Sequence, residues 1–149
     1  MENDSLLILM AEDDNGHATL VQRNLKRAGI VNPILHFKDG QQVLDFLFRR
    51  GDYAGREPDG PVVLVLDINM PRVDGVEVLR QLKQNEHTVK IPVIVLTTTD
   101  DPREVQRCYE LGCNVYILKP VSYDDFIEAI KRLGLLLSIV KVPREDERV

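Results

Sequence analysis

Short runs of apolar residues alternate with longer amphipathic stretches along most of the chain. The apolar runs predict five β-strands, at residues 6–12, 32–37, 62–67, 92–97 and 114–118. The amphipathic stretches predict five helices, at residues 15–28, 40–50, 75–85, 102–111 and 123–136. Local signals support these limits, because Gly29 can end the first helix in the left-handed conformation and Asp101-Pro102 offers a cap and a first-turn proline for the fourth.

Strands that are apolar on both faces and alternate with helices are typical of a parallel sheet covered on both sides. Five strand–helix units are too few for a closed barrel of eight, and they match a flavodoxin-like α/β sheet with strand order 2-1-3-4-5. Residues 49–61 are polar and rich in glycine and proline, so we expect a surface loop there. One domain accounts for residues 1–136, and residues 137–149 are expected to form a short C-terminal tail.

Composition narrows the classes of function. The chain has 149 residues, 44% of them hydrophobic, and a formal net charge of −5, which favours a soluble globular domain and disfavours a nucleic-acid-binding protein with its usual basic patch. No apolar stretch is long enough to span a membrane, and the first residues do not resemble a signal peptide. Cys108 and Cys113 are too few for a disulfide scaffold and lack a zinc-binding spacing, so we expect packing roles for them. A cytoplasmic protein is the simplest interpretation.

Residues suited to phosphate chemistry stand at the carboxyl ends of four of the predicted strands or directly after them. They are Glu12 with Asp13, then Asp67, Thr97 and Lys119. Ligands bind at the carboxyl ends of parallel strands, so we expect these side chains to converge on one patch. Each residue alone has an ordinary explanation as a helix cap, a turn residue or a solvated side chain. Their placement at the ends of four separate strands is what favours a phosphoryl-accepting site.

Carboxylates gathered in one place repel each other, and a divalent cation relieves this repulsion. Mg²⁺ prefers oxygen ligands, commonly one or two carboxylates together with water and phosphate oxygens. Glu12, Asp13 and Asp67 could supply the carboxylates, and the backbone carbonyl of Asn69 a further oxygen. The sequence therefore predicts a magnesium site at this edge of the sheet.

Beside such a metal, Asp67 is the expected nucleophile, which attacks phosphorus to give an acyl phosphate. Lys119 would contribute a fixed positive charge and Thr97 a hydroxyl donor to a phosphate oxygen. One alternative is a phosphohydrolase of the haloacid dehalogenase type, which places a second Asp two residues after its nucleophile, where this chain has Asn69. Another is a dimeric scaffold that is not regulated by phosphorylation, although its acidic site would be expected to be degraded.

Together these residues resemble the receiver domain of two-component response regulators. Residues 67–75 match the acceptor loop of that family. Thr97 lies thirty residues after Asp67 and Lys119 twenty-two after Thr97, and both spacings match the family pattern. Tyr116 stands three residues before Lys119, where the family has its switch aromatic.

The resemblance covers about residues 6–136 and implies a mechanism. A histidine kinase would donate its phosphoryl group to Asp67 with the help of Mg²⁺, and the same site would later hydrolyse the acyl phosphate. The chain would then be a signalling module rather than an enzyme. Phosphate would draw in Thr97, Tyr116 would turn inward, and the face formed by the fourth helix, fifth strand and fifth helix would change its contacts with an unidentified downstream protein.

A narrower resemblance points to single-domain regulators that are partnered with bacterial phytochromes. It rests on residues 16–18, 97–104 and 108–116, and on a loop before the third strand that is longer than in compact receivers.

Two features lie outside this mechanism. His17 stands at the start of the first helix, and we expect a surface or capping role for it. The strongly apolar stretch at residues 133–143 could simply be the fifth helix packing on its own sheet before it frays. We instead expect a homodimer in which the tail, residues 137–149, reaches the second protomer, because an exposed helix rarely carries so many large apolar residues.

Overall fold

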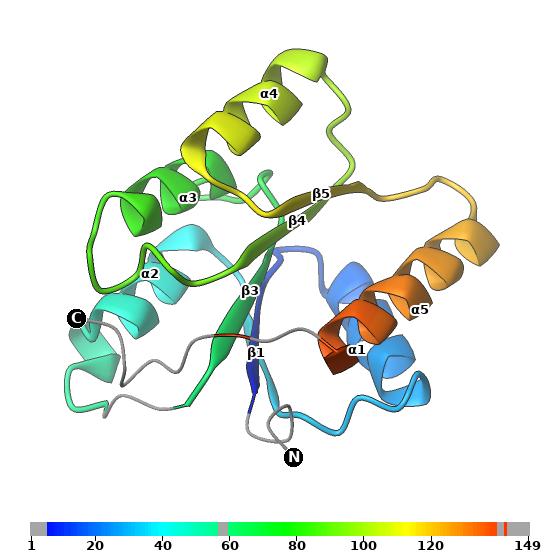
Figure 1. Ribbon diagram of the computed structural model, residues 1–149, viewed down its shortest axis with the longest axis horizontal. Coiled ribbons are helices and arrows are strands. Elements are labelled where there is room, and N and C mark those ends of the chain that lie inside the picture. The colour runs from blue at the N-terminus through cyan, green and yellow to red at the C-terminus, as the bar shows by residue number, and fades with distance from the viewer. Residues whose placement is uncertain (1–5, 57–59, 140–141, 143–149) are drawn as a thin grey trace.

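Five parallel strands form a single sheet in the order β2-β1-β3-β4-β5 (Figure 1). The computed structural model describes residues 6–56, 60–139 and 142. The strands are β1 (Leu7–Ala11), β2 (Ile34–Phe37), β3 (Val62–Leu66), β4 (Val93–Thr97) and β5 (Val115–Leu118). The helices are α1 (Asn15–Arg27), α2 (Gly40–Phe48), α3 (Gly75–Lys83), α4 (Pro102–Leu111) and α5 (Tyr123–Ile139), with a short 3-10 helix, η2 (Gly51–Tyr53). The flavodoxin-like fold and the strand order predicted from the sequence are confirmed.

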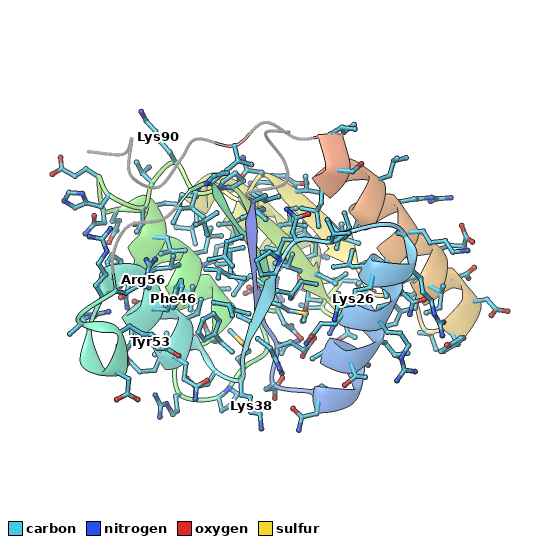
Figure 2. All side chains as sticks on the ribbon, turned by 90° about the horizontal axis from the view of Figure 1, so that it is seen from below. Lys26, Lys38, Phe46, Tyr53, Arg56 and Lys90 are labelled. Atoms are coloured by element: carbon cyan, nitrogen blue, oxygen red, sulfur yellow. The ribbon has the colours of Figure 1, made fainter. Side chains whose placement is uncertain are left out.

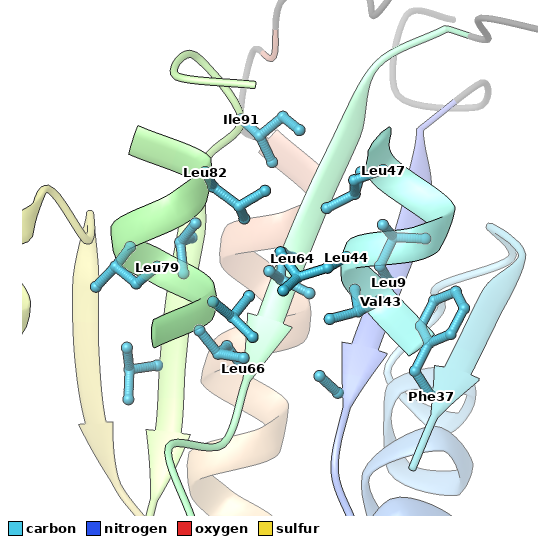
Figure 3. Close-up of a cluster of buried hydrophobic side chains, with 14 of the residues drawn as sticks. Leu9, Phe37, Val43, Leu44, Leu47, Leu64, Leu66, Leu79, Leu82 and Ile91 are labelled. Carbon is cyan, nitrogen blue, oxygen red and sulfur yellow. The ribbon is translucent and has the colours of Figure 1, made fainter. Parts of the chain in front are cut away.

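The central strands are apolar on both faces because the sheet separates two cores. In β3, Leu64 and Leu66 point into a core shared with α2 and α3, whereas Val63 and Val65 point into a second core shared with α1 and α5. The second pair of helices lies side by side on its face of the sheet (Figure 1). Figure 3 shows the first core, with Leu9, Phe37, Val43, Leu44, Leu47, Leu64, Leu66, Leu79, Leu82 and Ile91 labelled. Burial of the apolar surface of these two cores supplies the main driving force for folding.

The helix termini follow capping residues. Asp14 caps α1 by accepting a hydrogen bond from the backbone N–H of His17, and Asp101 caps α4, as predicted, by accepting from the N–H of Arg103. Gly29, with a φ of 96°, takes the left-handed conformation just beyond α1 that was expected of it. Helix α2 ends at Phe48 rather than at residue 50, because Arg49 itself adopts the left-handed conformation.

Helix α5 is longer than the sequence pattern suggested. It was expected to end at residue 136 and continues to Ile139, because Leu133 and Leu137 both remain in the core beneath it. Gly134 allows the close approach to α1, since a Cβ there would lie 3.1 Å from the Cβ of Ala28. Of the predicted tail, residues 137–139 belong to this helix and residues 140–141 and 143–149 lie outside the described residues.

Aromatic packing holds the described part of the expected surface loop between α2 and β3. It contains η2, and the Tyr53 ring lies edge-on to Phe46, with centroids 5.2 Å apart. The guanidinium of Arg56 lies over the ring of Phe46 at 4.0 Å from the ring centroid and donates a hydrogen bond to the Phe46 carbonyl (Figure 2). Residues 57–59 of the loop lie outside the described residues.

The pairing register aligns the carboxyl ends of four strands at one edge of the sheet. Ala11 of β1 is paired with Leu66 of β3, and Thr97 of β4 with Leu118 of β5. The residues at these ends and directly after them are therefore brought together across the sheet.

Within the part of the chain that the structure describes, no helix combines the length and apolar character needed to cross a bilayer.

Candidate functional site

The end of β1 supplies two acidic side chains with different surroundings. Glu12 is buried, while Asp13 is exposed at the same edge. The backbone of Glu12 is fixed on both sides, because its N–H donates to the Phe37 carbonyl and its carbonyl accepts from Nε2 of His36 at 2.6 Å. Asp14, the next acid, caps α1 and so has a structural role at this position.

The end of β3 presents a nearly buried carboxylate, that of Asp67, which is 7% exposed. One of its oxygens, Oδ1, accepts from the hydroxyl of Thr97 at 2.8 Å and from the backbone N–H of Asn69 at 3.0 Å. The loop after it is tightly packed, because a Cβ on Gly75 would lie 2.5 Å from the backbone carbonyl oxygen of Asp67. This close approach fixes the acceptor carboxylate relative to the start of α3.

The end of β5 supplies a buried ammonium. The backbone N–H of Lys119 donates to the Thr97 carbonyl at 2.7 Å, which continues the β4–β5 pairing and directs the side chain toward the acidic edge. Nζ donates to Oε1 of Glu12, to Oδ2 of Asp67 at 3.2 Å and to Nδ1 of His17 at 3.0 Å. Because an ammonium has only donors, Nδ1 of the imidazole must be the acceptor.

Three carboxylates meet at this edge. Glu12, Asp13 and Asp67 each offer one oxygen, and these oxygens all lie within 4.8 Å of one another. Burial raises the pKa of the Glu12 carboxyl from its ordinary value of 4.5 to about 7, with a further contribution from the charge of Asp67, although the hydrogen bond from Lys119 acts in the opposite direction. An excess of negative charge that one ammonium does not compensate fits a site for a divalent cation with oxygen ligands.

The position of Tyr116 links this edge to the β4–α4 loop. Its hydroxyl donates to the backbone carbonyl of Thr99 at 2.6 Å, and burial raises the pKa of this hydroxyl to about 12. Its backbone N–H, on the open edge of β5, donates to the hydroxyl of Tyr109 from α4 at 3.1 Å. The Asn69 side chain also reaches this loop and donates to the hydroxyl of Thr99 at 2.7 Å.

Five of the residues singled out from the sequence thus lie together: Glu12, Asp13, Asp67, Thr97 and Lys119. Tyr116 is linked to this group through the β4–α4 loop, where its hydroxyl contacts the Thr99 carbonyl. The two cysteines are buried in the core beside α2 and α3, as expected. The expectation for His17 was incomplete, because its backbone does take part in the α1 cap but its side chain contacts Lys119. The contacts of Tyr109 and Thr99 were not predicted, since no local motif marks them.

Comparison with known proteins agrees with this geometry. A family model described as the response regulator receiver domain matches residues 8–131. The chain is 39% identical to the probable methanogenesis regulatory protein FilR2 of Methanothrix harundinacea over 89% of this chain and 85% of that protein. A crystal structure of a response regulator receiver domain from Rhodospirillum rubrum shares 48% identity, with a TM-score of 0.86 over 93% of this chain and 97% of that one. The crystal structure of the phosphorylated cyanobacterial phytochrome response regulator RcpA shares 28% sequence identity with this chain. Its TM-score is 0.84, and the match covers 92% of this chain and 97% of that one.

Proposed function

This chain belongs to the response regulator receiver domain family, and we propose that it accepts a phosphoryl group on Asp67 from the phosphohistidine of a histidine kinase. The observation that carries the proposal is the buried Asp67 carboxylate, which is flanked by the Thr97 hydroxyl and the Lys119 ammonium. An oxygen of Asp67 forms the new bond to phosphorus while the bond from phosphorus to the kinase histidine nitrogen breaks. Lys119 and Thr97 then donate hydrogen bonds to the phosphoryl oxygens and offset their negative charge.

Glu12, Asp13 and Asp67 would hold Mg²⁺ in this site, with the backbone carbonyl of Asn69 as a further oxygen ligand. The cation would supply positive charge against the phosphoryl oxygens. Hydrolysis of the acyl phosphate, in which water displaces Asp67 from phosphorus, returns the site to its starting state. The chemistry begins and ends on the chain's own Asp67, so the chain acts as a signalling domain and not as an enzyme with a separate substrate.

The signal is proposed to leave through Thr97 and Tyr116. The Thr97 hydroxyl, now 2.8 Å from Asp67, would turn to a phosphoryl oxygen. Tyr116 would release the Thr99 carbonyl and turn inward, which alters the face made by α4, β5 and α5. In a Thr97→Ala variant, phosphorylation should no longer shift the NMR signals of Tyr116, and an unchanged shift would contradict this role.

The acceptor is tested by intact-protein mass after incubation with acetyl phosphate, with and without Mg²⁺. Acetate then takes the place of histidine as leaving group. The wild-type chain should gain one phosphoryl mass only with Mg²⁺, and Asp67→Asn should gain none. Asp52→Asn, an exposed acid in η2, is the matched control and should behave like wild type. No adduct on wild type, with early time points sampled, would favour an unphosphorylated scaffold instead.

The kinase is proposed to be a phytochrome-type photoreceptor. Support comes from the similarity over almost the whole chain to RcpA, which is described as a phytochrome response regulator. The chain is similar over a comparable length to a methanogenesis regulatory protein, whose name refers to a different pathway. Phosphotransfer should therefore be compared between a purified phytochrome kinase of the source organism, in its two light states, and an unrelated histidine kinase. Transfer that is no faster from the phytochrome kinase would contradict the proposal.

We also propose that residues 1–136 act as the receiver and that residues 137–149 help to join two copies. Part of the apolar sequence near the C-terminus is explained without a partner, because Leu133 and Leu137 are buried within the protomer. Leu135 and Ile139 are not, with 66% and 69% of their surface exposed on α5. Light scattering should give a dimer mass for wild type and a monomer mass for Ile139→Glu, whereas Val31→Glu, exposed in the loop after α1, is the control. A concentration-independent monomer mass for wild type would refute the dimer.

A further inference from the structure

His17 is held in place from two sides at the start of α1. Its backbone N–H donates to Oδ1 of Asp14, the cap of the helix, at 3.0 Å. Its ring meets the ring of Phe126 from α5 edge-on, with centroids 5.6 Å apart. The side chain is about one third exposed, at 35%, so the imidazole is packed without being enclosed. The ring therefore has a defined orientation, and its Nδ1 atom faces Lys119.

The ammonium of Lys119 uses all three of its N–H groups within the protein. Two go to carboxylates, those of Glu12 and Asp67, and the third goes to Nδ1 of His17 at 3.0 Å. The Lys119 side chain is 2% exposed, so with His17 in place water is largely excluded from the ammonium. An unpaired buried donor of this kind is costly, and a charged donor more so. The third acceptor is consequently needed to keep the ammonium where it lies.

The chemical type of that acceptor also matters. A third carboxylate would hold Lys119 equally well, but it would add negative charge beside a site meant for phosphoryl oxygens. A neutral imidazole satisfies the donor without that cost.

We propose that His17 is a positioning residue that holds the Lys119 ammonium between Glu12 and Asp67. The importance of this contact for phosphoryl uptake rests on the proposed role of Asp67. Without the imidazole, the ammonium turns fully toward the two carboxylates and is less available to the incoming phosphoryl group. The residue is not itself a ligand of phosphate or metal.

Two variants separate this role from simple packing. His17→Leu keeps apolar bulk against Phe126 and removes the acceptor. His17→Asn places an amide oxygen near the position of Nδ1 and restores an acceptor without a charge. Thr19→Ala, at an exposed position of the same helix, is the control. Thermal melts of all four chains ensure that rates are compared among folded proteins.

The first readout does not depend on phosphorylation. In protein labelled with ¹⁵N-lysine, the Lys119 ammonium signal, assigned by its loss in Lys119→Gln, should exchange with water about tenfold faster in His17→Leu, which corresponds to one charge-assisted hydrogen bond. Exchange in His17→Asn and Thr19→Ala should stay within about threefold of wild type. Equal exchange in His17→Leu and wild type would overturn the proposal.

The second readout is the rate of phosphorylation by acetyl phosphate at saturating Mg²⁺. His17→Leu should be about tenfold slower than wild type and His17→Asn should recover most of the rate. Equal slowing of both variants would mean that only the ring's packing matters and would overturn the proposal. If wild type takes up no phosphoryl group, the proposed role of Asp67 fails, and the exchange measurement still decides whether His17 holds Lys119.

Discussion

The protonation of Glu12 should make Mg²⁺ binding depend on pH near neutrality. Burial raises the pKa of this carboxyl from 4.5 to about 7 in the metal-free protein, and the neighbouring Asp67 charge contributes. A cation ligand must be ionised, so binding of Mg²⁺ expels the proton wherever Glu12 still holds it. With a pKa of about 7, roughly one molecule in eleven has Glu12 ionised at about pH 6 and roughly ten in eleven at about pH 8. The apparent Mg²⁺ affinity should therefore rise about tenfold over this range, or about 1 kcal/mol.

Isothermal titration calorimetry at about pH 6, 7 and 8 measures this directly. Repeating each titration in two buffers with different heats of ionisation counts the protons released, which should approach one at the lowest pH. Glu12→Gln keeps an oxygen ligand and removes the titrating proton, so its weaker affinity should be nearly constant over the same range. A wild-type affinity that does not change with pH, or a slope that survives in the Gln variant, would refute the reasoning.

The raised pKa of the same carboxyl also predicts how the stability of the metal-free chain changes with pH. Its pKa is higher in the folded state than in the unfolded state, so its contribution to stability is fully present below 4.5 and is lost as pH rises through about 7. The difference between these values corresponds to a loss of about 3 kcal/mol in the free energy of unfolding. Urea denaturation of wild type relative to Glu12→Gln isolates this term from other carboxyls. A stability difference between the two that did not move against wild type with rising pH would be inconsistent with a raised pKa.

Two further outcomes follow from packing. Gly75→Ala should lower the free energy of unfolding by about 1–3 kcal/mol and slow phosphorylation, because its Cβ would lie 2.5 Å from the backbone oxygen of Asp67. Gly55→Ala, with open space around it, is the control and should change the free energy of unfolding by no more than about 1 kcal/mol. Similar urea midpoints for the two variants would argue against a tightly packed loop at Gly75. Cys108 and Cys113 are buried, and burial raises the pKa of the Cys108 thiol to about 11 and that of Cys113 above its ordinary value. Both thiols should react with a disulfide reagent far more slowly in the native protein than in urea, and rapid reaction of either native thiol would show that this core opens easily.

The fold could be predicted closely because the signals for it are local. Each strand is a short apolar run, and each helix begins near a capping residue, so Asp101 marked the start of α4 and Gly29 the end of α1. The positions of Asp67 and Lys119 followed from one further rule, that residues after parallel strands meet at a common edge. The pairing register of the strands aligns their carboxyl ends, and this alignment needs no special sequence feature.

The contacts that could not be predicted depend on side-chain direction. His17 and Lys119 are 102 residues apart, and whether an imidazole in the first turn of α1 faces the site depends on how that helix is rotated against α5. The hydroxyl of Tyr109 meets the edge of β5 for a similar reason. The end of α5 was misplaced because an apolar run does not reveal which of its residues face inward, and only the packing of Leu137 shows that the helix continues.

The alignment of strand ends also has a consequence for synthesis of the chain on the ribosome. The carboxylate of Glu12 and the ammonium that pairs with it are separated by 107 positions, and Lys119 follows β5, the last of the five strands of this sheet in chain order. A nascent chain that has completed β1, β3 and β4 already carries Glu12 and Asp67 but lacks the ammonium that pairs with both of them. The proposed phosphoryl-accepting site should therefore become complete abruptly, when β5 emerges and docks, and chains truncated before Lys119 should not take up a phosphoryl group.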